Sequence, residues 1–552
     1  MEETNINCSK LTFKECESAI LRMQVNAAQT KIAKRELDSD KMQNIIKITE
    51  EFIKNNDVIC YGGTAINNIL PKKAQFYDRT VDMADYDFFT TDGLKCAKEL
   101  ADIFLKNGYR DIEAKSAQHK ETYKVFVNFI SIADISTLPK SIYDSLKKNA
   151  IIIDNIYYVP PNFLRMAIYV ELSRPAGYTD RWEKLVPRLQ LLNDYYPIEA
   201  NNCYLKNSKK LLNINKNGND HINEIIFNVL VNENVVFFGG VAMSQYLNSK
   251  KGKKDIKLDK EDKEDKKLDK EDKEDKEDKE DKKLDKEDKE DKKMNKEYNA
   301  AITDVYVLAR NPLKTANAVI DALKKININA EKIYQDAIGD IIPERYDIKI
   351  KKAVVASIYK PIACHSYNII NMNGKKVFIA TIETMLSFYL AFLYINNPYE
   401  VSEKMLCMSK DLLELQEKHR LDQKGIFKRY TITCYGHQPS QQEMREEKAK
   451  MYEKLKNKIG TLEYNKWFYN YKPSKVMSNK TMNQKTMNNK QNYFKNNNNK
   501  YVQNNQEKDL QNSKDLENSK DLQKKPKKTR KARKKKHTFV NPYDTRKKRK
   551  FW

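Results

Sequence analysis

The chain has 552 residues, of which 40% are hydrophobic and 32% are charged, so it can form two to four domains with buried cores and is not disordered throughout. Its formal net charge is +25, and residues 473–552 alone carry 24 lysines and arginines against 6 acidic residues, a net of +18. This concentration of basic charge predicts an anionic partner, either a nucleic acid or a membrane surface.

The first predicted elements are helices within residues 1–56. Apolar residues recur at helical spacing in two segments of this region, SKLTFKECESAILRMQV and DKMQNIIKITEEFIKNN. We therefore expect an N-terminal helical region before the first domain.

The next segments alternate between strand and helix patterns. DVICYGGTAINNIL (57–70) contains a short strand, a Gly-Gly turn and a helix that opens at Thr64. VDMADYDFFT is the next strand, GLKCAKELADIFLKNG is an amphipathic helix that ends at Gly108, and TYKVFVNFISIADIS provides one or two further strands. The helical segments PPNFLRMAIYVELSRP and RWEKLVPRLQLLNDYYP complete a domain predicted to cover residues 57–200.

The same order of elements recurs in residues 201–445. NVVFFGGVAMSQYL (234–247) repeats the pattern of DVICYGGTAINNIL, and ITDVYVLAR lies where MADYDFFT lies in the first copy. Between them, residues 250–297 contain KEDKEDKKLDK repeats with 20 lysines against 21 acidic residues, so we expect a disordered insert. The sequence therefore predicts an internal duplication, followed by a linker helix at 446–472 and a disordered basic tail at 473–552.

Three carboxylates follow the Gly-Gly turn of the first copy. Asp85 and Asp87 share one face of a strand about 22 residues after the turn, and Asp134 follows in SIADIS. Converging carboxylate oxygens are the ligands that Mg²⁺ prefers, and a glycine turn at a helix start suits a phosphate. Each motif alone is ordinary, since a Gly-Gly turn or a solvated pair of aspartates is common. Together, in this order, they predict a metal-dependent nucleotidyltransferase.

These motifs resemble the polymerase-β-type nucleotidyltransferase superfamily and, more closely, the poly(A) polymerase catalytic subunits of large cytoplasmic DNA viruses. The resemblance rests on YGGTAINNIL, DYDFFT, ADIS, FLRMAIYVELSRP with RWEKLVPRLQLL, and RYTITCYGHQ, and it covers roughly residues 40–440. It implies an α+β fold in which a nucleotidyltransferase domain precedes a degenerate second one. It also implies template-independent addition of AMP from ATP to the 3′ end of viral mRNA, with Mg²⁺ or Mn²⁺ as the cofactor.

The resemblance implies a role for individual residues. Asp85 and Asp87 would hold both metal ions, and Asp134 would bind the ion nearest the RNA 3′-hydroxyl and help to deprotonate it. The expected nucleotide-binding residues are Gly62, Gly63, Thr64, Asn67, Arg174 and Lys184. Alternatives stay open, because the two cations also fit a solvated face and Asn67 also fits a mid-helix amide without a ligand. Trp182 is expected to pack rather than to stack on a base.

The second copy lacks most of these acids. Asp304 aligns with Asp85, but Tyr306 stands where Asp87 would be and Ser357 replaces Asp134. A site with one carboxylate of three should not hold two metal ions. We therefore expect the second copy to be inactive and to serve packing, dimerisation or RNA binding.

The sequence does not specify the product of such an enzyme or its partners. A uridylyl- or CCA-adding enzyme, a cyclic-dinucleotide synthase, or a non-catalytic RNA-binding or assembly protein are alternatives. The expected partners are ATP, an RNA 3′ end, and either a second copy of the chain or a viral processivity subunit. The basic tail is expected to retain RNA, with nuclear import or solubilisation as its alternative roles.

The cysteines and the hydropathy pattern predict a compartment. The eight cysteines are scattered without a CxxC pair, and neither a signal peptide nor an apolar run near 18 residues is evident. We therefore expect reduced thiols, no membrane association and a location in the host cytoplasm at the viral factory, with the virion and the nucleus as alternatives. A zinc site built from Cys364-His365 and Cys434-x-x-His437 is disfavoured, because the spacing matches no known module.

Overall fold

The computed structural model describes eleven parts of the chain: residues 8–9, 11–37, 39–78, 85–200, 203, 216–248, 305–339, 341–351, 353–372, 374–395 and 402–472. The insert predicted at 250–297 and the tail predicted at 473–552 lie outside these residues. Within the described parts, no helix has the length and apolar character needed to cross a membrane.

Two helices precede the first sheet, as the hydrophobic spacing predicted. They are α1 (Phe13–Leu37) and α2 (Asp40–Asn55). Ser39 caps α2 by accepting a hydrogen bond from the backbone N–H of Met42. One face of α2 is buried, and Phe52 on that face packs 6.4 Å from the ring of Phe88, centroid to centroid. The helix therefore packs against β2, the strand that carries Asp87.

The first sheet has seven strands in the order β3-β4-β5-β2-β1-β7-β6. Its centre is mixed, because β2 runs parallel to β5 and antiparallel to β1. The strands are β1 (Ile59–Tyr61), β2 (Tyr86–Thr90), β3 (Ile112–Ser116), β4 (Thr122–Val127), β5 (Ile130–Thr137), β6 (Ile151–Ile153) and β7 (Ile156–Tyr158). The helices of this domain are α3 (Gly62–Ile69), α4 (Gly93–Lys106), α5 (Lys140–Lys148), α6 (Pro161–Leu172) and α7 (Trp182–Tyr195).

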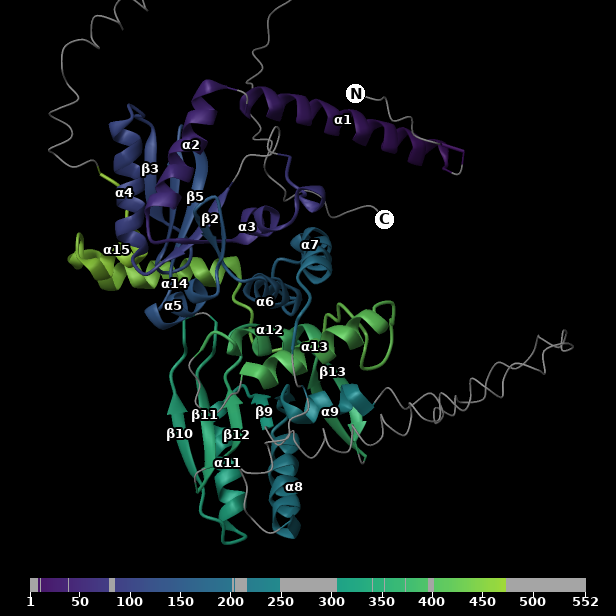
Figure 1. Ribbon diagram of the computed structural model, residues 1–552. Coiled ribbons are helices and arrows are strands. Elements are labelled where there is room, and N and C mark those ends of the chain that lie inside the picture. Colours follow the sequence, from purple (N-terminus) through teal and green to yellow (C-terminus); the bar gives the residue numbers. More distant parts are fainter. Residues whose placement is uncertain are drawn as a thin grey trace, which may run out of the picture. The chain divides into compact units, whose positions relative to one another are not determined.

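The second sheet repeats this topology in the order β10-β11-β12-β9-β8-β14-β13-β15. Figure 1 shows β10, β11, β12 and β9 next to one another in this order. Each pairing of the first seven strands has the direction of its counterpart, including the parallel pair at the centre. The strands are β8 (Val236–Phe237), β9 (Val305–Leu308), β10 (Glu331–Gln335), β11 (Arg345–Ile350), β12 (Ala353–Tyr359), β13 (His365–Met372), β14 (Lys375–Ala380) and β15 (Cys434–Tyr435). The fold is therefore α+β and internally duplicated, as predicted.

The helices of the second domain also follow the first. They are α8 (Lys216–Asn232), α9 (Gly240–Asn248), α11 (Pro312–Lys324), α12 (Ile382–Phe392) and α13 (Ser402–Lys418). Asp92 caps α4 by accepting from the N–H three residues later, and Asn311 caps α11 in the same way. The helices α6 and α12, which follow the two copies of the sheet, pack against each other. The duplicated helices thus form the contact between the two copies.

The segment predicted as a linker helix at 446–472 differs in the structure. It contains the end of α14 (Gln441–Leu455), the helix α15 (Leu462–Phe468) and an extended stretch that lies along β3. The N–H of Ser116 donates to the carbonyl of Tyr469 at 3.0 Å, and the N–H of Tyr471 donates to the carbonyl of Ala114 at 2.8 Å. These bonds cover the exposed edge of the first sheet, so the segment is part of that domain's packing.

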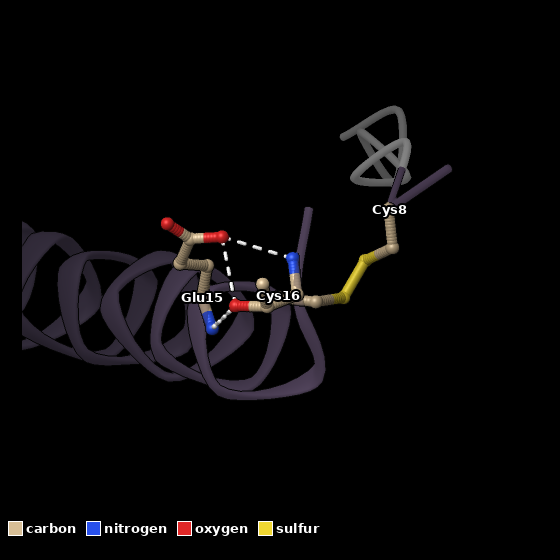
Figure 2. Close-up of a disulfide and its surroundings, with 4 residues drawn as sticks. Cys8, Glu15 and Cys16 are labelled. Carbon is tan, nitrogen blue, oxygen red and sulfur yellow. Dashed lines mark hydrogen bonds between the residues drawn. A yellow bond between two sulfur atoms is a disulfide. The ribbon is translucent and has the colours of Figure 1, made fainter. Parts of the chain in front are cut away.

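The expectation of reduced thiols is wrong for six of the eight cysteines. Disulfides join Cys8 to Cys16, Cys203 to Cys407 and Cys364 to Cys434, with Cα atoms 5.1–5.5 Å apart, and Figure 2 shows the first of them beside the start of α1. The antiparallel pairing of β13 with β15 brings the third pair together. Sequence spacing could not reveal the second, whose cysteines are 204 residues apart. Cys60 and Cys96 are free and buried.

Candidate active site

The Gly-Gly turn between β1 and α3 requires glycine for two reasons. Gly62 has φ +75°, a conformation that side chains disfavour. A Cβ atom there would also lie 2.1 Å from Oδ2 of Asp87. The pairing of Tyr61 with Asp87 across β1 and β2 creates this close approach. The turn and the aspartate pair, predicted as one site, are therefore in direct contact.

Thr64 follows the turn, and its hydroxyl donates to the backbone carbonyl of Asp85 at 2.8 Å. The Thr64 side chain is buried, so this bond fixes the chain just before β2. The hydroxyl of Thr64 is thus engaged within the protein, and the nucleotide-binding role of Thr64 stays a prediction.

The predicted carboxylates Asp87 and Asp134 lie side by side. The parallel pairing of β2 with β5 places Asp87 directly opposite Asp134, and Asp85 precedes β2 by one residue. Desolvation, followed by the negative charges of Asp85 and Asp134, raises the pKa of Asp87 to about 7. Desolvation, followed by the charge of Asp134, also raises the pKa of Asp85. The three acids therefore repel one another in the protein without a bound cation.

Lys124 contacts the candidate site, although the sequence did not indicate it. It lies opposite Asp134 on the neighbouring strand β4, and its Nζ donates to Oδ2 of Asp134. Its charge lowers the pKa values of Asp85 and Asp87. The alternation in TYKVFV places Lys124 on the polar face of a strand, but only the register of β4 against β5 reveals its partner.

The predicted metal site consists of carboxylate oxygens on adjacent strands. The described residues contain no group of three or more His, Cys, Asp or Glu side chains already arranged to hold a metal ion. However, Oδ1 of Asp134 is buried without a hydrogen-bond partner, and Asp87 lies on the adjacent strand. These are hard oxygen donors with strong mutual repulsion, so they fit a divalent cation such as Mg²⁺.

Two cations at the start of α7 act on these acids: Arg181, the residue just before the helix, and Lys184 in its first turn. Lys184 lowers the pKa of Asp85 and Arg181 lowers that of Asp87. Arg181 also forms an ion pair with Glu171 at 3.2 Å. The predicted residue Lys184 is therefore close enough to the aspartates to act on their charge.

Arg174 has other neighbours. Desolvation raises the pKa of Glu171 and lowers that of His365, the buried first residue of β13, and the positive charge of Arg174 acts to lower both pKa values. The N–H of Ser366 donates to the carbonyl of Ser173, so this part of the chain lies at the contact with the second domain. The structure thus places Arg174 at this junction, and its nucleotide-binding role stays a prediction.

The two amides of α3 bind protein groups. The side chain of Asn67 is buried, and its Oδ1 accepts hydrogen bonds from the backbone N–H groups of Phe76 and Tyr77, both at 2.8 Å. Asn68 donates to the hydroxyl of Tyr158 at 3.0 Å. The Asn67 oxygen is therefore not available to a ribose, and the residue holds the loop after α3 instead.

Trp182 packs, as predicted. Its indole N–H donates to the carbonyl of Glu171 at 3.2 Å, and its ring lies 5.9 Å from that of Tyr430, centroid to centroid. The ring is partly buried against the core.

In the second copy, residues that are not acidic occupy the positions of Asp87 and Asp134. Tyr306 pairs with Ser357 as Asp87 pairs with Asp134, and Ser357 pairs with Asp347 as Asp134 pairs with Lys124. Tyr306 lies in an aromatic cluster with ring centroids 5.7–6.3 Å away on its neighbours, which are Phe238, Tyr359 and Phe392. The aligned Asp304 lies outside the described residues. A tyrosine and a serine therefore occupy the positions of Asp87 and Asp134 in the second copy.

Comparison with known proteins agrees with this site. Residues 47–178, which contain the turn and all three aspartates, match the family described as the poly(A) polymerase catalytic subunit. The resemblance to viral poly(A) polymerase catalytic subunits is confirmed.

The relatives cover the first domain best. A protein of Acanthamoeba polyphaga mimivirus whose assigned name is poly(A) polymerase catalytic subunit is 34% identical over 160 residues, which are 28% of this chain and 27% of the relative. An African swine fever virus protein with the same assigned name is 26% identical over 189 residues, 33% of this chain and 39% of the relative. The chain thus spans less than half the length of each of these relatives.

A solved structure extends the likeness to both domains. The crystal structure of the Megavirus polyadenylate synthase superposes with a TM-score of 0.63, covering 89% of this chain and 91% of that one, at 18% sequence identity. At this identity the comparison shows a shared fold. It supports the duplicated α+β architecture.

Proposed function

We propose that the chain is a template-independent poly(A) polymerase that adds AMP from ATP to the 3′ end of mRNA. The observation that carries this proposal is the placement of Asp87 beside Asp134 and against Gly62, within the segment that matches the poly(A) polymerase family. The choice of ATP and of an mRNA 3′ end rests on the names of the relatives and not on a base-reading contact.

In this proposal the acids of the site bind the metal ions and the cations bind the triphosphate. Asp85, Asp87 and Asp134 would hold Mg²⁺ or Mn²⁺, which when bound supplies positive charge beside the attacking and leaving oxygens. The buried, unpartnered Oδ1 of Asp134 is an acceptor for the proton of an attacking ribose hydroxyl. Lys184 and Arg181 face the acids and would bind the triphosphate.

The second domain has a supporting role in this proposal. With Tyr306 and Ser357 in place of two acids, it would contribute packing and RNA contacts rather than chemistry. A second copy of the chain or a separate subunit would be its partner, and the name catalytic subunit carried by the relatives supports the latter. The cytoplasmic location stays a prediction.

The experiment is an extension assay with a short RNA, Mg²⁺ or Mn²⁺, and each nucleoside triphosphate supplied singly. We expect extension with ATP. Asp87→Asn should reduce the rate by at least ~10³-fold, because it removes a metal ligand while keeping the side-chain shape. Asp144→Asn, at an exposed carboxylate on α5, is the matched control and should keep full activity.

Three outcomes would contradict the proposal. Extension only with UTP or CTP would indicate a different terminal transferase. If the RNA is not extended with any of the four nucleotides, a non-catalytic RNA-binding protein is favoured. An unchanged extension rate in Asp87→Asn would likewise contradict catalysis at this site.

A further inference from the structure

The helices α14 and α15, drawn in yellow-green in Figure 1, border a groove that is open to solvent. The two helices pack against each other, and the groove has a volume of about 520 Å³. Its charged and aromatic lining residues are Arg445, Lys448, Lys450, Tyr452, Glu453 and Phe468. All of these except Phe468 belong to α14, so one helix supplies most of the groove.

The groove carries positive charge that the protein does not neutralise. Its three cations are Arg445, Lys448 and Lys450, and among the described residues none of them forms an ion pair. Lys448 instead donates through Nζ to the backbone carbonyl of Ala117 at 2.8 Å. Glu453, the carboxylate in the lining, pairs with Lys456 outside it. The groove is therefore complementary to a polyanion.

Two aromatic rings lie among these cations. The ring of Tyr452 lies 5.5 Å from that of Phe468, centroid to centroid, and Nζ of Lys448 lies 5.9 Å from the Phe468 centroid. Tyr452 is 43% exposed, so part of its ring is accessible to a ligand. Single-stranded nucleic acids bind to this combination, because bases stack on rings while backbone phosphates contact cations. An acidic peptide would use the cations and leave the rings unused.

The basic tail of the chain does not have the charge to fill this groove. Residues 473–552 contain 24 lysines and arginines against 6 acidic residues, so the three cations of the groove would repel them. A negatively charged strand from outside the chain has the complementary charge.

Contacts of α14 connect the groove to segments that lead to the candidate active site. At the start of the helix, Gln441 donates to the hydroxyl of Tyr178, in the segment just before α7. Gln441 also accepts from Gln118, in the turn between β3 and β4, at 3.2 Å. The strand β4 carries Lys124, the partner of Asp134. The groove thus belongs to a helix that is bonded to the domain of the acids.

We propose that the groove between α14 and α15 binds the RNA single strand on the 5′ side of its 3′ end. Tyr452 stacks on a base, and Arg445 and Lys450 contact backbone phosphates. The identity of the strand rests on the proposed polymerase function, and the groove adds a contact surface for it outside the acidic site. Since every base has an aromatic face, we expect the groove to bind RNA without a strong base preference.

The test measures binding of a short fluorescein-labelled oligo(A) RNA to the full chain by fluorescence anisotropy, with EDTA and without ATP. Arg445→Gln/Lys450→Gln should weaken binding and reduce the slope of log K against log salt concentration by about 1.4, or ~0.7 for each lost phosphate contact. The matched control is Lys54→Gln/Lys106→Gln, which removes two exposed lysines on α2 and α4 and should bind as the wild type does. Because every variant keeps the basic tail, differences between them report on the groove.

A second pair of variants tests the ring. Tyr452→Ala should weaken oligo(A) binding by about fivefold or more, the low end of the effect of removing a ring that stacks on a base. Tyr452→Phe keeps the ring and should bind as the wild type does. In the extension assay, Tyr452→Ala should raise KM for RNA and leave KM for ATP unchanged. A melting temperature close to that of the wild type shows that the variant is folded.

The outcomes separate the groove from the proposed activity. Equal affinity and equal salt slope in Arg445→Gln/Lys450→Gln and its control would overturn the proposal. It would also be overturned if Tyr452→Ala bound RNA as the wild type does while the double variant lost affinity for both RNA and polyglutamate, because the groove would then bind an acidic protein segment. If both groove variants lose RNA affinity but the wild type incorporates no nucleotide, the RNA-binding groove stands and the proposed polymerase activity fails.

Discussion

At the scale of single residues, the acidic cluster is a source of instability that function requires. Asp87 is held next to Asp134 by strand pairing and close to Asp85 by sequence, so none of the three can move away from the others. Lys124 offsets part of the repulsion by pairing with Asp134. Such clusters of acids with shifted pKa values are characteristic of sites that bind cations or transfer protons.

The raised pKa of Asp87 predicts that the stability of the folded protein depends on pH. Desolvation raises this pKa to about 7, whereas an aspartate in an unfolded chain titrates near ~3.9. A raised carboxyl pKa means that stability is fully present below the unfolded value and is lost as pH rises through about 7. We therefore expect the free energy of unfolding of chelator-treated Asp87→Asn to be ~1–3 kcal/mol higher than that of the wild type at pH 8. At pH 5 the difference should be smaller.

Urea denaturation at the two pH values measures this difference. Asp144→Asn, at an exposed carboxylate, should show no comparable gain. Equal stabilities of the wild type and Asp87→Asn at pH 8 would show that the cluster is not under electrostatic strain.

The site residues differ in how far the sequence reveals them. The aspartates and the glycine turn are predictable because their chemistry needs fixed spacings along one chain segment. Lys124 is not, because it contacts a residue on another element and strand register alone brings the two together. Asn67 shows the reverse case, since its position on α3 indicated a ligand while its partner is a loop.

At the scale of elements, the strand β2 packs closely against the Gly-Gly turn at the start of α3. The strand places Asp87 on the side of Gly62, so the turn has no space for a side chain. Hydrophobic periodicity predicted β2, α4 and α6 because each has one apolar face. It did not predict the extended stretch at 469–471, whose pairing with β3 depends on backbone hydrogen bonds rather than on an apolar pattern.

The turn gives a paired test at this scale. Gly62→Ala should destabilise the protein by ~2–4 kcal/mol and abolish activity, because it combines a strained φ with displacement of Asp87. Gly108→Ala also has a positive φ, +89°, but no atom lies within 4 Å of its added Cβ. It should cost only the backbone strain, ~1 kcal/mol, and retain activity. Thermal unfolding with an extension assay checks both, and equal activity losses would contradict the close approach to Asp87.

At the scale of the whole molecule, the two copies show what the fold requires and what the site adds. Strand order, strand direction and the register of the central strands are the same in both sheets. Even the irregularity in the β4–β5 pairing, after Val125, recurs in the β11–β12 pairing after Ile348. The duplication was visible in the sequence because the turn repeats. The Asp347 partner of Ser357 was not, since it depends on that register.

The two copies balance their central charges differently. In the first, the half-buried Lys124 pairs with Asp134. In the second, Asp347 is buried, and it accepts hydrogen bonds from Arg345 at 3.0 Å and from Ser357 at 2.7 Å. In both copies one carboxylate oxygen is buried without a hydrogen-bond partner among the described residues: Oδ1 of Asp134 and Oδ2 of Asp347. The copies differ in their charges, because the second pairs a single buried carboxylate with the buried Arg345, whereas the first has three neighbouring carboxylates.

This contrast predicts opposite effects at two aligned positions. Ser357→Ala removes one donor to a buried carboxylate and should cost ~1–2 kcal/mol in unfolding free energy, with the activity of the folded protein unchanged within about twofold. Asp134→Asn should abolish activity while changing stability little or raising it, because it removes a charge from a repulsive cluster. Urea denaturation and the extension assay, applied to both variants, distinguish the two roles. Loss of activity in folded Ser357→Ala would show that the second copy takes part in the reaction.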